Sequence, residues 1–183
     1  MRELIPPDPP LQDDIVLLRP PELGDADALL PIRSEEDTRR WMLWDDEPPP
    51  DHAEILANIE RAQQSWAEGT WAVFVITVDG EIVGGANLGF YEHEIAEGSY
   101  FLARAVRGRG YATRTLRLLA RWAFEENGIE RLELRVDPGN KASLRLAERV
   151  GFTREGIERA SRRATDGSRF DSVVFSLLPG ELA

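Results

Sequence analysis

Two β-branched, apolar runs lie at residues 70–78 and 82–90. The short connection between them begins with the dipeptide Asp79-Gly80. An Asp-Gly pair between two such runs is a strong signal for a β-hairpin with a tight turn. A third run of the same kind follows at residues 99–106. The centre of the chain is therefore predicted to form an antiparallel sheet of at least three strands.

Helical patterns precede this strand-rich centre. Two short stretches at residues 25–34 and 36–44 and a longer one at residues 51–68 are separated by prolines. The longer helix opens on an aspartate, a good N-cap, and its apolar residues follow the spacing of one buried face. Because proline lacks a backbone N–H and clashes with the preceding turn, we expect Pro31 to interrupt the first stretch and the prolines at 48–50 to end the second.

After the centre, the hydrophobic period changes from two residues to about 3.6, as expected for a helix. The apolar face of this helix is formed by Leu116, Leu119, Ala120, Ala123 and Phe124, and we expect it to end at Gly128. The rest of the pattern predicts a strand at 131–136, a helix at 141–150, and strands at 152–159 and 170–178. A short strand is also expected near the start, at residues 15–19.

These elements predict one mixed α/β (α+β) domain, with a mostly antiparallel central sheet of about six to seven strands flanked by helices. We assign residues 14–183 to this domain, because residues 1–13 contain four prolines and are typical of an extended tail. A chain of 183 residues buries roughly 70% of its unfolded surface on folding. A hydrophobic core is therefore available without disulfides.

The composition excludes several kinds of site. The chain has no cysteine, which excludes disulfides, thiolate zinc sites and cysteine nucleophiles. With only two histidines, His52 and His93, we expect no metal centre. The net charge of −11 opposes binding to nucleic acid. Since no apolar run approaches 20 residues and no leader-like segment is visible, we expect no membrane span and a cytoplasmic location.

Charge is unevenly distributed along the chain. Residues 1–100 carry a net charge of −16, and residues 101–183 carry a net charge of +5. Scattered, solvated charge would give such a split. It is also what an anionic ligand held by the second half and a cationic ligand approached by the first would require.

The turn at residues 107–113 carries the strongest chemical signal. It lies where a predicted strand becomes a helix, and glycines at 108 and 110 allow a tight turn there. The first free N–H groups of a helix and its dipole favour an anion. Arg104, Arg107 and Arg109 add positive charge. The segment is therefore predicted to bind a phosphate or diphosphate, the alternative being a tight turn with solvated arginines.

Two other phosphate-binding motifs fit this turn less well. A Walker loop needs Gly-x-x-x-x-Gly-Lys-Ser/Thr, whereas the one lysine of the chain is Lys141. A Rossmann fingerprint needs a third glycine where this chain has Thr113, although Glu130 and Glu133 lie at roughly the spacing expected for a ribose ligand. A Rossmann loop also follows the first strand of its domain, whereas here three earlier strands precede the strand that leads into the turn.

The segment Arg107-Gly-Arg-Gly110-Tyr-Ala112 resembles the Arg/Gln-x-x-Gly-x-Gly/Ala signature of the GNAT superfamily of N-acetyltransferases. The similarity extends from about residue 15 to 178. Four further segments resemble the ribosomal-protein N-terminal (Rim-type) acetyltransferase branch: 41–44, 97–102, 136–143 and 151–159, with Asp171 before the last strand. The resemblance implies a GNAT-like fold, acetyl-CoA as co-substrate, and no metal.

The resemblance also implies which residues bind acetyl-CoA. Backbone N–H groups of the turn would hold the diphosphate, from Arg107, Gly108, Arg109, Gly110, Tyr111, Ala112 and Thr113. Phe101, Leu102 and Ala103 correspond to the splayed strand that pairs with the pantetheine arm. One N–H near Leu102 or Ala103 would polarise the thioester carbonyl, as preorganised backbone donors do.

Asn140 and Ser143 lie where a predicted strand leads into a helix. The Asn140 amide can bond to a pantetheine amide or cap the helix, and both roles are compatible. Ser143 is expected to bind the cofactor and to donate to the leaving thiolate, as matching serines are proposed to do in this branch; a bond to the helix backbone is the alternative. Many members place a tyrosine acid where this chain has Ala147, which shifts that role to Ser143 or water.

The attacking amine must be neutral. At pH 7 the neutral form costs roughly 4–5 kcal/mol for a lysine side chain but about 1 kcal/mol for a peptide α-amine, so α-amines need a strong base less. Glu97, at the head of the cofactor strand, is the candidate catalytic base, acting directly or through water, and an ordinary exposed carboxylate is the alternative. Glu92, His93 and Glu94 are weaker candidates in the preceding loop.

Aromatic side chains are expected to bind the acceptor, because indole faces attract cations. The candidates are Trp41, Trp44, Tyr91 and Tyr100. In this family the early helix pair, which includes Met42, walls the acceptor site. Asp45, Asp46 and Glu47 follow directly and would attract a cationic N-terminus. Ordinary core packing is the alternative for these aromatics.

The sequence therefore predicts an acetyl-CoA-dependent N-acetyltransferase that acts by direct attack of a primary amine in a ternary complex. The preferred acceptor is a protein or peptide N-terminal α-amine. A small amine (an amino acid, polyamine or aminoglycoside) and a non-catalytic acyl-CoA sensor are the alternatives. A homodimer is one candidate assembly.

Overall fold

The computed structural model describes residues 4–44, 48–91, 94–163 and 167–183. Within them, the strands are β1 (Leu11–Gln12), β2 (Val16–Arg19), β3 (Trp71–Val78), β4 (Glu81–Phe90), β5 (Ile95–Leu102), β6 (Arg131–Val136), β7 (Thr153–Arg163) and β8 (Arg169–Leu177). The α-helices are α1 (Ala26–Ser34), α2 (Glu36–Trp41), α3 (His52–Glu68), α4 (Tyr111–Arg121) and α5 (Lys141–Val150). Short helical turns are η1 (Leu23–Asp25), η2 (Arg104–Val106) and the π-helical η3 (Trp122–Glu126).

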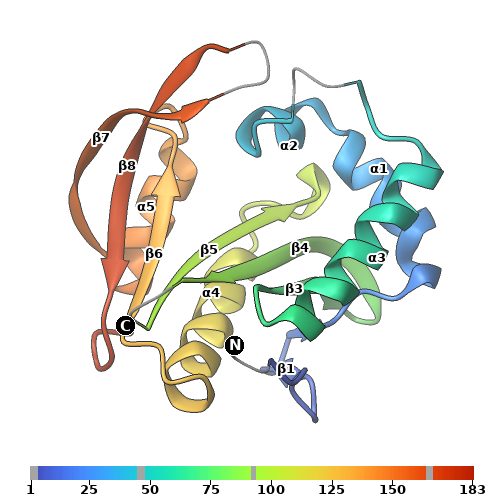
Figure 1. The fold of residues 1–183 in the computed structure, drawn as a ribbon, viewed down its shortest axis with the longest axis horizontal. Helices are drawn as coiled ribbons and strands as arrows, with labels where there is room; N and C mark the ends of the chain where they lie inside the picture. The colour runs from blue at the N-terminus through green and yellow to red at the C-terminus, as the bar shows by residue number, and fades with distance from the viewer. Residues whose placement is uncertain (1–3, 45–47, 92–93, 164–166) are drawn as a thin grey trace.

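The eight strands form one sheet in the order β1-β2-β3-β4-β5-β6-β8-β7 (Figure 1). Neighbouring strands pair antiparallel, except β5 and β6, which are parallel. The predicted mixed, mostly antiparallel sheet is thus confirmed. It has one strand more than expected, because Leu11 and Gln12 pair with Leu18 and Leu17 of β2.

The hairpin between β3 and β4 forms as its sequence predicts. Asp79 has a φ of 51° and Gly80 a φ of 82°, so both turn residues adopt the positive φ that a type I′ turn requires. The right-handed twist of the strands favours this turn, and it fixes the β3–β4 register up to an irregularity at Ile76/Thr77.

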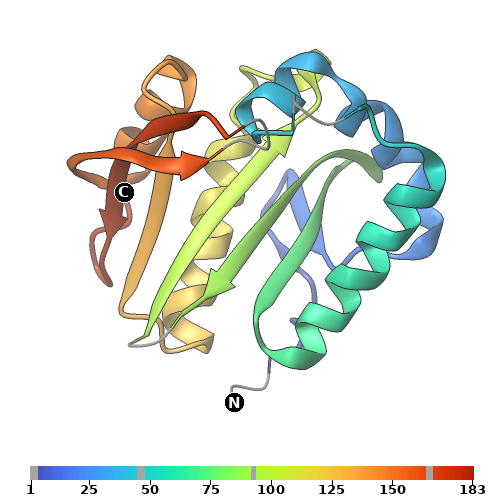
Figure 2. The ribbon, with the colours of Figure 1, turned by 45° about the horizontal axis from the view of Figure 1, so that its top comes forward.

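Helices cover both faces of the sheet (Figures 1 and 2). Residues of α1 and α3 pack together against Val75 of β3, where Ile55 and Ile59 are almost fully buried. The larger core lies on the other face, where Leu116 and Leu119 of α4 pack against the strands.

Three sequence expectations are wrong at the level of boundaries. The third central strand begins at Ile95 and ends at Leu102 rather than spanning 99–106, and the chain then turns through η2. Pro31 does not interrupt α1. The carbonyl it leaves without a helical donor belongs to Asp27, four residues earlier, which is exposed to water. The second stretch ends at Trp41 rather than at residue 44.

Within the described ranges, no helix is long and apolar enough to cross a membrane. The same residues contain no group of three or more His, Cys, Asp or Glu side chains arranged to hold a metal ion.

Candidate active site

The parallel strands β5 and β6 separate shortly after they meet. They pair only from Ile95 to Glu97 of β5, opposite Arg131 to Glu133 of β6. Beyond this point β5 stays paired with β4 up to Leu102, whereas β6 turns away with β8 (Figure 2). A wedge therefore opens between the two strands, and backbone groups of β5 face it without a strand partner.

Alternation along β5 decides which backbone groups face the wedge. The Ala103 N–H donates to the Val83 carbonyl at 2.9 Å, and bonded pairs of an antiparallel ladder recur at every second residue. Phe101 and Ala103 therefore direct their backbone groups to β4. Tyr100 and Leu102 direct theirs to the wedge. The Leu102 carbonyl accepts a bond from Arg107 Nε at 3.0 Å, which leaves the Leu102 N–H as the candidate donor for a ligand.

The turn before α4 presents a row of backbone N–H groups. Gly108 and Gly110 have φ values of 81° and 85°, and a Cβ atom added at either would meet nothing within 4 Å. The first helical bond runs from the Arg114 N–H to the Gly110 carbonyl, and no side chain caps the helix. The N–H groups of residues 111–113 therefore point out of the helix end. Thr113 adds a buried hydroxyl without a hydrogen-bond partner.

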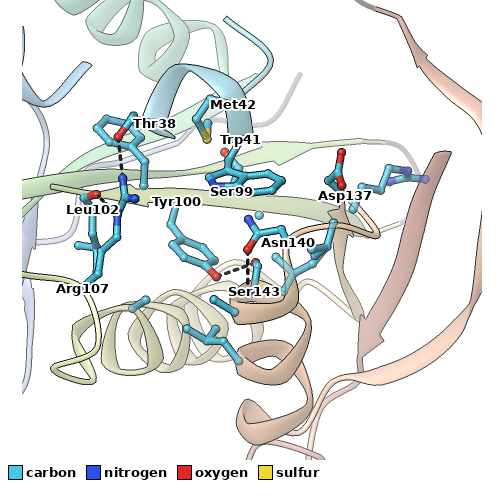
Figure 3. A pocket seen from close by; sticks show the side chains of 18 of the residues that line it. Thr38, Trp41, Met42, Ser99, Tyr100, Leu102, Arg107, Asp137, Asn140 and Ser143 are labelled. Atoms are coloured by element: carbon cyan, nitrogen blue, oxygen red, sulfur yellow. Dashed lines mark hydrogen bonds between the residues drawn. The ribbon is translucent and has the colours of Figure 1, made fainter. Parts of the chain in front are cut away.

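Arg107 has a different role from the other residues of this turn. Its N–H bonds to the Arg104 carbonyl at 3.3 Å. Its guanidinium contacts Glu35 and Asp37 of the α2 region at 3.3 Å each, and Thr38 Oγ1 at 3.0 Å (Figure 3). The side chain thus ties α2 to the end of β5, and its charge is matched by two carboxylates.

These features line one cavity of about 550 Å³. Most of the site residues expected from the sequence line it: Trp41, Trp44, Glu97, Tyr100, Phe101, Leu102, Arg107, Gly108, Gly110, Tyr111, Ala112, Thr113, Asn140 and Ser143. Ala103, Arg109 and Tyr91 do not line it. Tyr91 is 53% exposed.

Ser143 and Tyr100 meet across the cavity. The Tyr100 hydroxyl and Ser143 Oγ are 2.8 Å apart (Figure 3). Burial raises the pKa of the Tyr100 phenol, and the bond to Ser143 offsets only part of this effect. The phenol therefore stays protonated at neutral pH. Asn140 Oδ1 accepts the Ser143 N–H at 3.1 Å, so Asn140 caps α5 while its amide nitrogen remains available to a ligand.

Glu97 is held by two arginines. Its Oε2 accepts from Arg135 at 2.8 Å and its Oε1 from Arg162 at 2.8 Å. Arg135 also contacts Glu133 and Glu158. The Glu97 side chain is 17% exposed. It lies inside β5 within a network of charges that joins β5, β6 and β7, and not at an open strand end.

The aromatic residues of the α2 region stack with cations of the protein itself. The Arg40 guanidinium lies 4.9 Å from the Trp41 ring, and that of Arg33 lies 4.5 Å from the Trp44 ring. Trp44 also packs edge-to-face on Phe101, with ring centroids 5.7 Å apart. Of these side chains, Trp41, Trp44 and Phe101 line the cavity.

Several candidates from the sequence have no described position. Asp45, Asp46, Glu47, Glu92 and His93 lie outside the described residues.

Glu94 is placed in the turn before β5. Its φ is 56°, and its carbonyl accepts the N–H groups of Glu130 and Arg131. It does not line the cavity.

The cavity also contains residues that the sequence reasoning did not single out. They include Asn87, Ser99, Arg135, Asp137, Arg145 and Arg162. Ser99 donates to Asn87 Oδ1 at 2.9 Å. Period-two alternation along β4 and β5 places Asn87, Ser99 and Glu97 on one face, and this was the one signal that could have grouped them.

Comparison with known proteins identifies the family. Residues 16–153 match the model of the acetyltransferase (GNAT) domain. The uncharacterized N-acetyltransferase p20 of Bacillus licheniformis is 30% identical over 177 residues, which cover 94% of this chain and 98% of that protein. The chain therefore belongs to the GNAT family of acetyltransferases.

Solved structures share the fold over nearly the whole chain. RimJ of Mycobacterium smegmatis, in complex with CoA-disulfide, matches with a TM-score of 0.81 and 26% identity, covering 91% of this chain and 83% of that one. The microcin C7 self-immunity acetyltransferase MccE, in complex with acetyl-CoA and AMP, matches with a TM-score of 0.83 and 21% identity, covering 91% and 93%.

The protein is thus an acyltransferase that uses acetyl-CoA as co-substrate, which favours the enzyme over the acyl-CoA sensor. The residues present fit this molecule. The uncapped α4 N-terminus offers unpaired N–H groups to a diphosphate. The wedge beside β5 offers strand-type pairing to an amide-containing arm, and two hydroxyls lie further along the same cavity.

Proposed function

We propose that this N-acetyltransferase acetylates the N-terminal α-amine of a protein or peptide, by direct attack in a ternary complex. One observation carries the proposal. A single cavity extends from the α4 N-terminus past the Ser143–Tyr100 pair to the aromatic wall of α2. An acyl donor lying along the wedge and an amine entering beside α2 would therefore meet within it.

On the donor side, the N–H groups of residues 108–113 would hold the diphosphate. The wedge-facing groups of Tyr100 and the Leu102 N–H would pair with the pantetheine arm. The Asn140 amide nitrogen is placed to bond to the same arm. Acetyl-CoA supplies the activated thioester. Leu102 is our candidate for polarising its carbonyl, since a preorganised N–H of this kind is worth roughly 10²–10³ in rate.

The amine nitrogen forms a C–N bond to the acetyl carbon, and the C–S bond breaks. Ser143 Oγ, supported by the protonated Tyr100 phenol, would donate a hydrogen bond to the departing sulfur. A thiol has an ordinary pKa near 8.5. The thiolate can therefore leave with this support and take its proton afterwards.

The proton lost by the amine needs an acceptor, and Glu97 remains our candidate. Both of its oxygens accept a bond from an arginine, but each carboxylate oxygen has a second lone pair. We propose that Glu97 receives the proton through a water molecule. The low cost of neutralising an α-amine, about 1 kcal/mol at pH 7, makes a stronger base unnecessary.

Two observations support an α-amine over a small amine. The first concerns the base. Both oxygens of Glu97 already accept bonds from arginines, and an α-amine needs a strong base less than a lysine side chain does. The second is the 26% identity to RimJ, since the sequence resembles the Rim-type branch of N-terminal acetyltransferases.

An N-terminal peptide library, incubated with acetyl-CoA and read by mass spectrometry, tests the proposal. We expect acetylation at α-amines, with thiol release in equal amount. Acetylation confined to free amino acids, polyamines or aminoglycosides offered in parallel would refute it.

A further inference from the structure

A second cavity of about 340 Å³ adjoins the first. It lies between α1 and α3 on one side and β3–β5 on the other, where the two helices run beside each other (Figures 1 and 2). The side chains that line both cavities are Met42, Trp44, Trp71, Asn87 and Phe101. Because these five form a shared wall, a molecule that enters beside Trp44 can reach both.

Two glycines of β4 leave room for aromatic rings that line both cavities. A Cβ atom at Gly85 would lie 2.7 Å from the Phe101 ring, and one at Gly89 would lie 2.7 Å from the Trp71 ring. Both rings can lie on the strand only because these side chains are missing. Phe101 and Trp71 in turn line the passage between the cavities.

Among the described residues, the charged side chains that line this second cavity are Arg33 of α1 and Arg61 of α3. None of the described residues that line it is an aspartate or a glutamate. The Arg33 guanidinium forms no hydrogen bond or ion pair with a side chain in the described part of the chain, and its Nε is buried without a hydrogen-bond partner. The Arg61 guanidinium donates to the neutral side chain of Asn58 and to no other described side chain.

The two arginines also disfavour each other. Burial lowers the pKa of Arg33, and the positive charge of Arg61 lowers it further. The Trp44 ring beneath Arg33 compensates part of this cost. A buried charge is otherwise expected to be paired, because desolvation costs several kcal/mol per ion. Arg107 and Arg135, at the first cavity, have carboxylate partners of this kind.

We propose that the cavity between Arg33 and Arg61 binds a carboxylate of the acceptor, so that the enzyme selects N-terminal segments with an acidic side chain soon after the reacting amine. This inference rests on the proposed function. The amine would lie in the first cavity, and the chain would pass over Trp44 and Phe101. A guanidinium pair with open donors is the arrangement that recognises a carboxylate.

Asn87 adds a neutral donor between the two cavities. Because its Oδ1 accepts from Ser99 Oγ at 2.9 Å, its amide nitrogen is left as a donor. It is placed to bond to a backbone carbonyl of the passing chain. The acidic first half of the sequence thus contains a local cationic site, built by residues from two different helices.

The test compares two hexapeptides that begin with serine. One has glutamate at positions 2 to 4, the other has glutamine at these positions, and the two are otherwise identical. Binding to the CoA-loaded enzyme is measured by calorimetry, and acetyl transfer by mass spectrometry. We expect the glutamate peptide to bind at least tenfold more tightly. Arg61→Met should abolish this preference, and so should Arg33→Met. Because Arg33 is partly buried, Arg61→Met on the exposed surface of α3 keeps the test independent of folding.

Arg121→Met is the matched control. Arg121 is exposed on α4, and its loss changes the net charge equally, so the preference should persist. Equal binding of both peptides to the wild type, or a preference that survives Arg61→Met and Arg33→Met, would overturn the inference.

Failure of the proposed function gives a different result. The glutamate peptide would then bind with the Arg61-dependent preference but remain unacetylated. Acetylation of both peptides at equal efficiency would instead preserve the proposed function and refute the acidic subsite. Free glutamate is also tested as a competitor of the bound glutamate peptide. If it displaced that peptide as effectively as unlabelled peptide does, the anion site would serve a small acceptor, and the peptide assignment would be overturned.

Discussion

Replacing Gly110 by alanine tests the turn before α4 in two ways, through the stability of the protein and through its binding of CoA. Gly110 is the N-cap of α4, with φ 85° and ψ −4°. A residue with a Cβ costs roughly 1–2 kcal/mol in this left-handed region. No atom lies within 4 Å of the added Cβ, so backbone strain is the whole expected loss. For a chain of this size it corresponds to a fall in Tm of about 2–8 °C.

Gly80 provides a matched control. It has a φ of 82°, nothing within 4 Å of an added Cβ, and a place in the β3–β4 turn away from the cavity. Gly80→Ala should therefore lower Tm by a similar amount. Only Gly110→Ala should weaken CoA binding, by tenfold or more, because its Cβ would project where the diphosphate is expected to lie.

Differential scanning calorimetry gives the two Tm values, and isothermal titration gives the two Kd values for CoA. If Gly110→Ala and Gly80→Ala bind CoA equally well at matched stability, the proposed role of the turn is wrong.

Three further outcomes follow from the same structure. Ser143→Ala should lower kcat by about 10²-fold, within the range typical for loss of one preorganised hydrogen-bond donor, while the KM for acetyl-CoA changes little; an unchanged kcat removes Ser143 from the mechanism. Burial raises the pKa of Tyr100, so the folded state holds the phenol proton at pH values where the unfolded chain loses it. The stability of the fold should therefore decrease as pH rises above about 10. Tyr100→Phe should abolish that part of the decrease in alkaline unfolding curves. Asp25 accepts bonds from Arg19 at 2.7 Å, so Asp25→Asn should cost about 2 kcal/mol at pH 7 in urea unfolding. Burial alone would raise the pKa of Asp25, but the bond from Arg19 and the Glu22 N–H lower it overall. The contribution of Asp25 to folding stability is therefore fully present above its unfolded-state pKa, near 3.9, and is lost as pH falls through its lower folded-state pKa. Equal stability of the wild type and Asp25→Asn at pH 7 would contradict this.

The parts of the fold that local chemistry determines were predictable. The Asp79-Gly80 turn, the Asp51 cap of α3 and the glycine turn before α4 each depend on residues within a few positions of one another. The start of β5 was not predictable. Gly98 looks like a strand breaker, yet an added Cβ there would lie 3.2 Å from the end of the Leu134 side chain, so packing against a residue of β6 favours a small residue at this position.

The site, like the fold, was predictable where it depends on neighbouring residues and not where it depends on contacts between distant ones. The N–H groups before α4 follow from one local motif. The pairing of Tyr100 with Ser143 joins residues 43 positions apart, and that of Glu97 with Arg162 joins residues 65 positions apart. Only the complete sheet brings these together. The convergence of Arg33 and Arg61 likewise depends on how α1 packs on α3.

The most direct test of the central claim is amide hydrogen exchange with and without CoA. CoA is expected to slow exchange at the N–H groups of residues 108–113, which lie at and just before the α4 N-terminus where no described side chain caps the helix, and to leave exchange at Asp79 and Gly80 unchanged. Saturating CoA with unaltered exchange at 108–113 would contradict it.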